Sequence, residues 1–158
     1  MSEKLLEQLQ AKKALKVPVE EFLKSVGYRS VTCPITKEFM AKPDFYGKRE
    51  EHTVAVYVVM DPRKIDNDLS RVKTVSFQLG RSVDYVLLLP AFEEKKLVEL
   101  VCLNEDKALK KIIKDKFTIW MWDAGKKKAV AYFNLPSDKA VREQIEDKGN
   151  IVAKSRGQ

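Results

Sequence analysis

The stretch that decides the fold is residues 43–60, which read PDFYGKREEHTVAVYVVM. A Pro-Asp pair opens it, a polar and charged segment follows at residues 47–52, and a β-branched and aromatic run completes it. Charged segments between apolar runs are typical of turns, and runs rich in valine are typical of strands buried on both faces. We therefore expect a turn at residues 47–52, followed by a central strand from Thr53 to Met60.

The segments before this stretch predict two helices and two short strands. Leucines recur at helical spacing through residues 1–16, which predicts an amphipathic helix. A second helix should run from Pro18 to Val26, where Gly27 can supply a left-handed stop. Between Tyr28 and Tyr46 we expect two short strands, around Val31, Ile35 and Phe39.

Downstream, helical and strand patterns alternate. We expect helices at residues 65–79, 92–103, 105–114 and 137–146, and strands at residues 83–89, 117–122 and 128–133. The order predicts an α/β protein with a mixed central sheet and flanking helices. We divide the chain into an N-terminal arm (1–16), one α/β domain (17–149) and a polar tail (150–158).

Composition favours a folded protein with a polyanionic partner. The 158 residues carry 30 Lys and Arg against 23 Asp and Glu, a net charge of +7, and such a surplus attracts nucleic acid. Interleaved charges such as Glu93-Glu94-Lys95-Lys96 also fit an ordinary solvated surface. Two distant cysteines suggest neither a disulfide framework nor a zinc site. With apolar runs too short to span a bilayer, we expect a cytoplasmic protein without a membrane partner.

The stretch from Pro43 to Val59 resembles the PD-(D/E)XK nuclease-like, or restriction-endonuclease-like, superfamily. The likeness continues through the helix at residues 69–79, the strand Asp84–Pro90 and the strand Thr118–Asp123, so that it covers residues 18–134. It implies an α-β-β-β-α-β core in a mixed sheet, here followed by a C-terminal hairpin and helix. It also implies a site where the second and third strands diverge.

In that superfamily a carboxylate after proline, an acid on the next strand and a lysine two positions later hold Mg²⁺ and orient water. Asp44 matches the first carboxylate. With the hairpin turn centred between Glu50 and Glu51, Asp44 stands opposite Tyr57, and the lysine position falls on Val59. The resemblance therefore implies a catalytically degenerate member. Should activity persist, Glu20 or Glu21 on the preceding helix is the candidate second acid, with Asp44 as the metal ligand.

Two groups of lysines form the predicted nucleic-acid-binding surface. One is the turn Lys126-Lys127-Lys128, and the other lies on the helix before it, at Lys107, Lys110, Lys111 and Lys114. A cluster of one sign attracts phosphates in a salt-dependent way, although exposed lysines also serve solubility. The adjacent Trp120 and Trp122 should pack under a covering helix. His52 is predicted to be a turn residue.

Three hypotheses follow from the sequence. The first is a catalytically inactive nuclease-like module that binds nucleic acid, DNA rather than RNA, or a partner protein. The second is an active nuclease using Asp44 with a displaced acid such as Glu21; only this hypothesis requires a cofactor, Mg²⁺. The third is a structural subunit that forms a homodimer or joins an active nuclease through an exposed sheet edge and the arm residues Leu5, Leu6 and Leu9.

Overall fold

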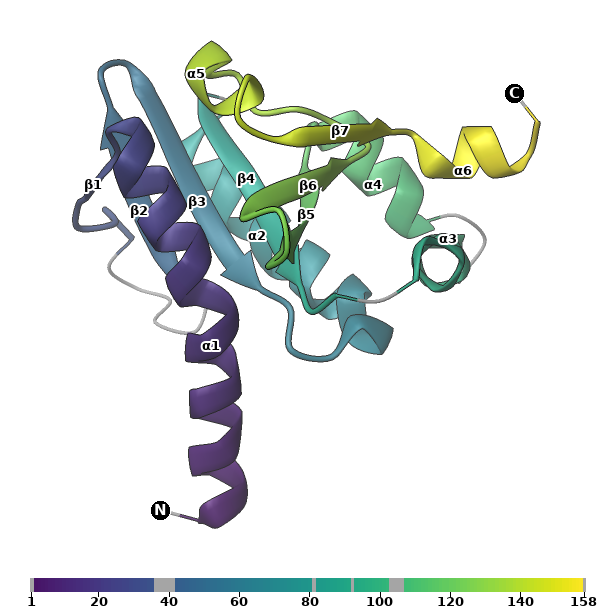
Figure 1. Cartoon of the computed structure of the whole chain (residues 1–158), viewed down its shortest axis with the longest axis horizontal. Helices are drawn as coiled ribbons and strands as arrows, with labels where there is room; N and C mark the ends of the chain where they lie inside the picture. Colours follow the sequence, from purple (N-terminus) through teal and green to yellow (C-terminus); the bar gives the residue numbers. More distant parts are fainter. Residues whose placement is uncertain (1, 36–41, 81, 92, 103–106, 158) are drawn as a thin grey trace.

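A computed structural model describes residues 2–35, 42–80, 82–91, 93–102 and 107–157 (Figure 1). Within these residues, seven strands form one mixed sheet in the order of the sequence. The predicted α/β class, with flanking helices and an α-β-β-β-α-β core, is confirmed. None of the helices in the described ranges is long and apolar enough to cross a membrane.

The centre of the sheet is parallel, antiparallel pairs lie on both sides of it, and one edge strand pairs in parallel with its neighbour. The strands are β1 Arg29–Ser30, β2 Phe45–Arg49, β3 His52–Val58, β4 Val83–Leu89, β5 Thr118–Asp123, β6 Lys128–Tyr132 and β7 Glu146–Gly149. Strand β4 pairs in parallel with β3 and β5, whereas β2 and β6 pair antiparallel with their neighbours β3 and β5. At the edges, β1 pairs antiparallel with β2, and β7 pairs in parallel with β6. Since helices cover both faces, β3 and β4 are almost wholly buried, as their valine-rich sequences predict.

Helices cover both faces of the sheet. They are α1 Glu3–Val26, α2 Ile65–Leu79 (after the 3₁₀ turn η2 Pro62–Lys64), α3 Glu94–Cys102, α4 Lys107–Asp115, α5 Lys139–Arg142 and α6 Ile151–Ser155. On one face α2, α3, α4 and α6 pack over residues such as Leu87, and on the other α1 and α5 pack over residues such as Leu88. The alternation along β5 buries Trp120 beneath α1, as expected.

The decisive stretch forms the predicted hairpin with a tighter turn. Arg49 lies opposite His52, so the turn is Glu50-Glu51, and extending the register places Asp44 opposite Tyr57 as predicted. Residues 47–49 belong to β2 instead of the turn. Gly47 is required there, because a Cβ atom would lie 2.8 Å from the ring of Phe45.

The two helices predicted at the N-terminus are one. Helix α1 runs without a break from its Ser2 cap to the left-handed Gly27, with Pro18 inside it. Proline removes one backbone hydrogen bond, but the buried Val19 and Leu23 hold the second part on the sheet. The ion pair between Lys16 and Glu20, 3.1 Å, spans the proline. The predicted boundary between arm and domain therefore lies within a continuous helix.

Two other predictions differ from the structure. The helix expected at residues 137–146 is limited to α5, and the polar residues Glu146–Gly149 form β7, parallel to β6. Pairing with a neighbouring strand overrides the weak strand propensity of this segment. The predicted polar tail contains α6, whose Ile151 and Val152 join the core. Of the short strands expected before Tyr46, the one around Phe39 falls outside the described residues.

Candidate functional site

Both carboxylate oxygens of Asp44, the predicted nuclease residue, already have partners. Its Oδ2 accepts a hydrogen bond of 2.7 Å from the backbone N–H of Val58 on β3. Its Oδ1 lies 2.5 Å from Nζ of Lys12, which reaches it from α1. The side chain of Asp44 is only 11% exposed and that of Lys12 is 35% exposed, so the ammonium is the counter-charge of the carboxylate in a partly buried pair. Lys12, a residue of the same chain, thus supplies the positive charge that balances this partly buried carboxylate.

A second ion pair lies beside the first. The Arg71 guanidinium on α2 donates to Asp68 Oδ1 at 3.1 Å and stacks 5.5 Å from the ring centre of Tyr57. Burial raises the pKa of Asp68 above its usual value, and the negative charge of Asp44 raises it further, against the opposing effect of Arg71. Two carboxylates and two cations thus form a charge-balanced cluster, here called the Asp44 cluster.

The residues of this cluster do not fit a Mg²⁺ ion. Mg²⁺ needs several oxygen ligands in near-octahedral order, yet Val59 offers none, and burial raises the pKa of Tyr57 so that its hydroxyl stays protonated. No group of three His, Cys, Asp or Glu residues in the described chain could hold a metal. Glu21 is exposed and nine residues from Lys12, about 14 Å along α1 and on its opposite side. The structure therefore does not bring Glu21 and Asp44 together.

The predicted lysines on α4 lie on the face of the sheet covered by α2, α3 and α4. Lys107, Lys110 and Lys114 are exposed, and Lys111 Nζ lies 3.4 Å from Ser70 Oγ on α2. The opposite side of α4 is apolar and buried through Ala108, Leu109 and Ile112. The lysines thus occupy the solvent side of an amphipathic helix.

The lysine turn between β5 and β6 is shaped by Asp123. Its Oδ1 accepts hydrogen bonds from the N–H groups of Gly125, 3.0 Å, and Lys126, 3.1 Å, which folds the turn back on itself. Lys127 closes the turn with a positive φ of 53°. Lys126 pairs with Glu146 at 3.7 Å, whereas Lys127 and Lys128 form no ion pair within the part of the chain that the structure describes.

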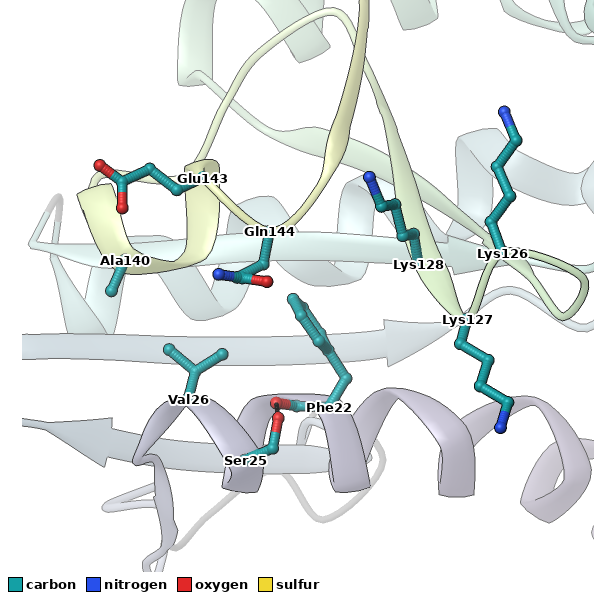
Figure 2. Close-up of a pocket in the computed structure, with 9 residues that line it drawn as sticks. All are labelled: Phe22, Ser25, Val26, Lys126, Lys127, Lys128, Ala140, Glu143 and Gln144. Atoms are coloured by element: carbon teal, nitrogen blue, oxygen red, sulfur yellow. Dashed lines mark hydrogen bonds between the residues drawn. The ribbon is translucent and has the colours of Figure 1, made fainter.

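These lysines line a pocket of about 620 Å³, here called the lysine pocket (Figure 2). Its other walls come from α1 and from the α5 region, and its full lining is Phe22, Ser25, Val26, Lys126, Lys127, Lys128, Ala140, Glu143 and Gln144. The α1 helix covers the sheet face opposite to α4. The two predicted lysine groups therefore do not join in one surface, because the sheet separates them.

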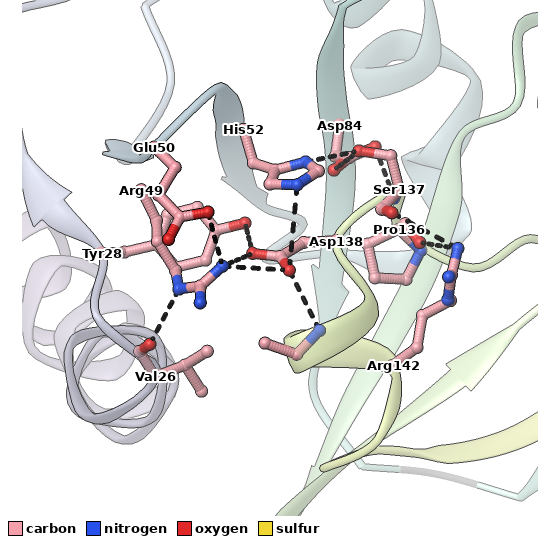
Figure 3. A network of polar contacts seen from close by, with 11 residues as sticks. Val26, Tyr28, Arg49, Glu50, His52, Asp84, Pro136, Ser137, Asp138 and Arg142 are labelled. Atoms are coloured by element: carbon pink, nitrogen blue, oxygen red, sulfur yellow. Dashed lines mark hydrogen bonds and ion pairs between the residues drawn. The ribbon is translucent and has the colours of Figure 1, made fainter.

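A polar network missed from the sequence surrounds Asp138 (Figure 3). Asp138 is buried, accepts a hydrogen bond of 2.8 Å from the Tyr28 hydroxyl, and pairs with Arg49 at 3.2 Å. Burial alone would raise the pKa of Asp138, but these partners hold it below its usual value. His52 Nδ1 lies 3.3 Å from Ser137 Oγ, which donates to Asp84 Oδ2 at 2.8 Å. These contacts tie α1, the β2–β3 hairpin, β4 and α5 together.

Comparisons with known proteins add little to this geometry. No protein-family model and no curated protein matches the chain. Among solved structures, the chain is similar to an XisH family protein from Nostoc punctiforme, at 12% sequence identity and a TM-score of 0.48. The similarity covers 73% of this chain and 94% of that protein. At this level the similarity carries no functional conclusion, so function must be argued from the residues themselves.

Proposed function

We propose that this chain is a catalytically inactive, PD-(D/E)XK nuclease-like module that binds nucleic acid, with DNA preferred to RNA. The observation that carries the proposal is the ion pair between Lys12 and Asp44. It places a fixed ammonium on the one carboxylate that matches a nuclease, next to Tyr57 in place of the second acid. A metal ion would have to displace Lys12 from this carboxylate, and neither Tyr57 nor Val59 supplies the second acid or the lysine that helps to activate water.

The binding half of the proposal is supported by the lysines that lack ion-pair partners. Among the described residues, Lys127 and Lys128 in the lysine pocket and Lys107, Lys110 and Lys114 on α4 form no ion pair. A lysine paired within the protein gains little from a phosphate, because it must exchange one anion for another. Lysines without a partner retain this capacity and release counterions from the nucleic acid when they bind it.

The test is a salt titration of binding to labelled single- and double-stranded DNA and RNA, with and without Mg²⁺. The proteins compared are wild type, Asp44→Ala and the triple variant Lys126→Ala, Lys127→Ala, Lys128→Ala. A second triple variant, Lys13→Ala, Lys95→Ala, Lys96→Ala, loses the same charge at exposed positions outside both lysine groups. We expect salt-dependent binding without cleavage, weakened more in the first triple variant than in the control. Mg²⁺-dependent cleavage that disappears in Asp44→Ala would contradict the proposal, as would the absence of binding.

A second candidate function is that of a structural subunit that pairs with another copy through the arm. Leu5, Leu6 and Leu9 are 45–49% exposed on the part of α1 that extends beyond the sheet (Figure 1). In an antiparallel pair, Leu5 of one copy packs against Leu9 of the other, so that each arm covers the exposed leucines of its partner.

Sedimentation equilibrium tests this second candidate. Wild type should dimerise, and Leu5→Lys with Leu9→Lys should be monomeric. Gln8→Lys with Gln10→Lys adds the same charge to the arm without removing the leucines, and should keep the dimer at low micromolar concentration. A monomeric wild type would reject the subunit role and leave the nucleic-acid proposal intact.

A further inference from the structure

We propose that the lysine pocket binds one nucleotide unit of a single-stranded nucleic acid. The phosphates on the two sides of the unit contact Lys127 and Lys128, and the base lies against Phe22 with its edge facing Gln144. This inference rests on the proposed function and deepens it, because it assigns the contact to one of the two lysine groups and specifies the form of the ligand.

The size and construction of the pocket suit such a unit. Its volume of about 620 Å³ falls within the range of roughly 300–1,000 Å³ typical of small-ligand sites. Three segments far apart in the sequence form its walls: the end of α1, the β5–β6 turn and the α5 region (Figure 2). The polar network around Asp138 joins α1 to α5, since Tyr28 follows α1 directly and Asp138 caps α5. The walls that come from α1 and α5 are therefore held together.

The charge at the mouth of the pocket is positive. Lys127 and Lys128 form no ion pair within the described residues, and Figure 2 shows their side chains extending to opposite sides of the turn, as flexible point charges suited to two successive phosphates. The one acid in the lining, Glu143, pairs with Lys139 at 3.9 Å. Lys126 is directed toward Glu146. Two of the three turn lysines thus remain for an anion.

An aromatic ring lies beside these cations. Phe22 lies edge-on to Trp120, with ring centres 6.2 Å apart, and tilted against Trp122 at 6.0 Å. Figure 2 shows its ring pointing into the pocket toward Gln144. A ring fixed by its neighbours can stack on a base without losing side-chain entropy, and every base has a face that can accept it. The amide of Gln144 offers one acceptor and two donors to a base edge.

Stacking on Phe22 favours single strands over duplexes. In a duplex each base is covered on both faces by its neighbours, so it must leave the stack before it meets a protein ring. An unpaired strand has no base pairs to break. Its phosphates are also flexible enough to reach Lys127 and Lys128 while the base enters the pocket. The lysines on α4 do not line the lysine pocket and should contact phosphates only, in either kind of nucleic acid.

Intrinsic fluorescence provides the test, since Trp122 is half-buried next to Phe22. Wild type is titrated with a twelve-residue oligothymidylate and with a duplex of the same length. We expect quenching and tighter binding with the single strand. Lys127→Gln with Lys128→Gln should weaken that binding about tenfold and lower the salt slope by about 1–2. The matched control Lys95→Gln with Lys96→Gln, at exposed positions outside both lysine groups, should change affinity less than twofold, and the α4 variant Lys110→Gln with Lys114→Gln should weaken binding less than the pocket variant does.

Phe22→Leu separates stacking from charge. It should weaken oligothymidylate binding about tenfold with the salt slope unchanged. Because Phe22 also packs on two tryptophans, Gln144→Ala, at an exposed position, serves as a second variant and should weaken binding several-fold without affecting folding. If the pocket variants bind like wild type while the α4 variant loses affinity, the pocket inference fails and the proposed function stands. If wild type binds neither ligand, both fail.

Discussion

The Asp44 cluster and the lysine pocket use the same kinds of side chain in opposite ways. In the cluster, Lys12 and Arg71 each lie within 3.1 Å of a carboxylate, and the carboxylates are shielded from water. In the lysine pocket, Lys127 and Lys128 stand in solvent without an ion pair among the described residues. Burial forces charges to pair, because an unpaired ion in a dry site is costly. The comparison predicts that the fold is sensitive to the loss of either partner in the cluster, and the pocket is the site that we propose for a ligand.

The largest effect on stability should follow the loss of Asp44. Asp44→Ala leaves the Val58 N–H and the Lys12 ammonium without their shared acceptor, which should lower the free energy of unfolding by about 2–3 kcal/mol. This free energy is measured by urea denaturation, with circular dichroism as the signal. A variant as stable as wild type would show that the cluster does not hold the fold.

Removing the cation instead of the acid should lower the free energy of unfolding by a smaller amount. Lys12→Met keeps the aliphatic stem, and Lys12 is 35% exposed, so solvent screens its charge. We expect a loss of about 1 kcal/mol in the same urea experiment. The control Lys13→Met, at the adjacent exposed position, should change stability by less than about 0.5 kcal/mol. Equal effects at the two positions would mean that the Lys12 pair contributes nothing.

The pH dependence of stability tests the raised pKa of Asp68. In the folded protein Asp68 holds its proton at pH values where the unfolded chain has lost it. Its contribution to stability therefore falls as the pH rises from the usual pKa of an aspartate toward the raised one. Asp68→Asn removes this contribution, so the stability of wild type relative to the variant should decrease over that interval. A difference that is constant with pH, measured by urea denaturation in steps from acid to neutral, would argue against burial of the carboxylate.

The smallest effect on stability is expected in the lysine pocket. Lys127→Gln with Lys128→Gln should leave the free energy of unfolding within about 0.5 kcal/mol of wild type, because neither side chain has an ion-pair partner to lose among the described residues. Thermal denaturation at low salt measures it. Marked destabilisation would reveal a structural role for these lysines and would remove the contrast with the Asp44 cluster.

Local sequence signals predicted much of the fold and little of the arrangement of sites. The turn at Glu50-Glu51 and the facing of Asp44 and Tyr57 were predictable because both depend on a short hairpin. The continuity of α1 through Pro18 depends on burial of Val19 and Leu23 under tertiary contacts. Helical spacing shows which side of α4 is polar, but not that the sheet stands between α4 and the lysine turn. The partners of Asp138 come from distant segments and left no local pattern.

The uninterrupted α1 helix has a consequence for avidity. This single helix carries the exposed leucines near its start, Lys12 in its middle and Phe22 near its end. If two copies join through their arms, each lysine pocket lies about 22 Å along α1 from the centre of the pair, and the two pockets are about 45 Å apart. A strand long enough to reach both would gain from a high effective concentration at the second pocket, whereas a short oligonucleotide would bind each copy independently.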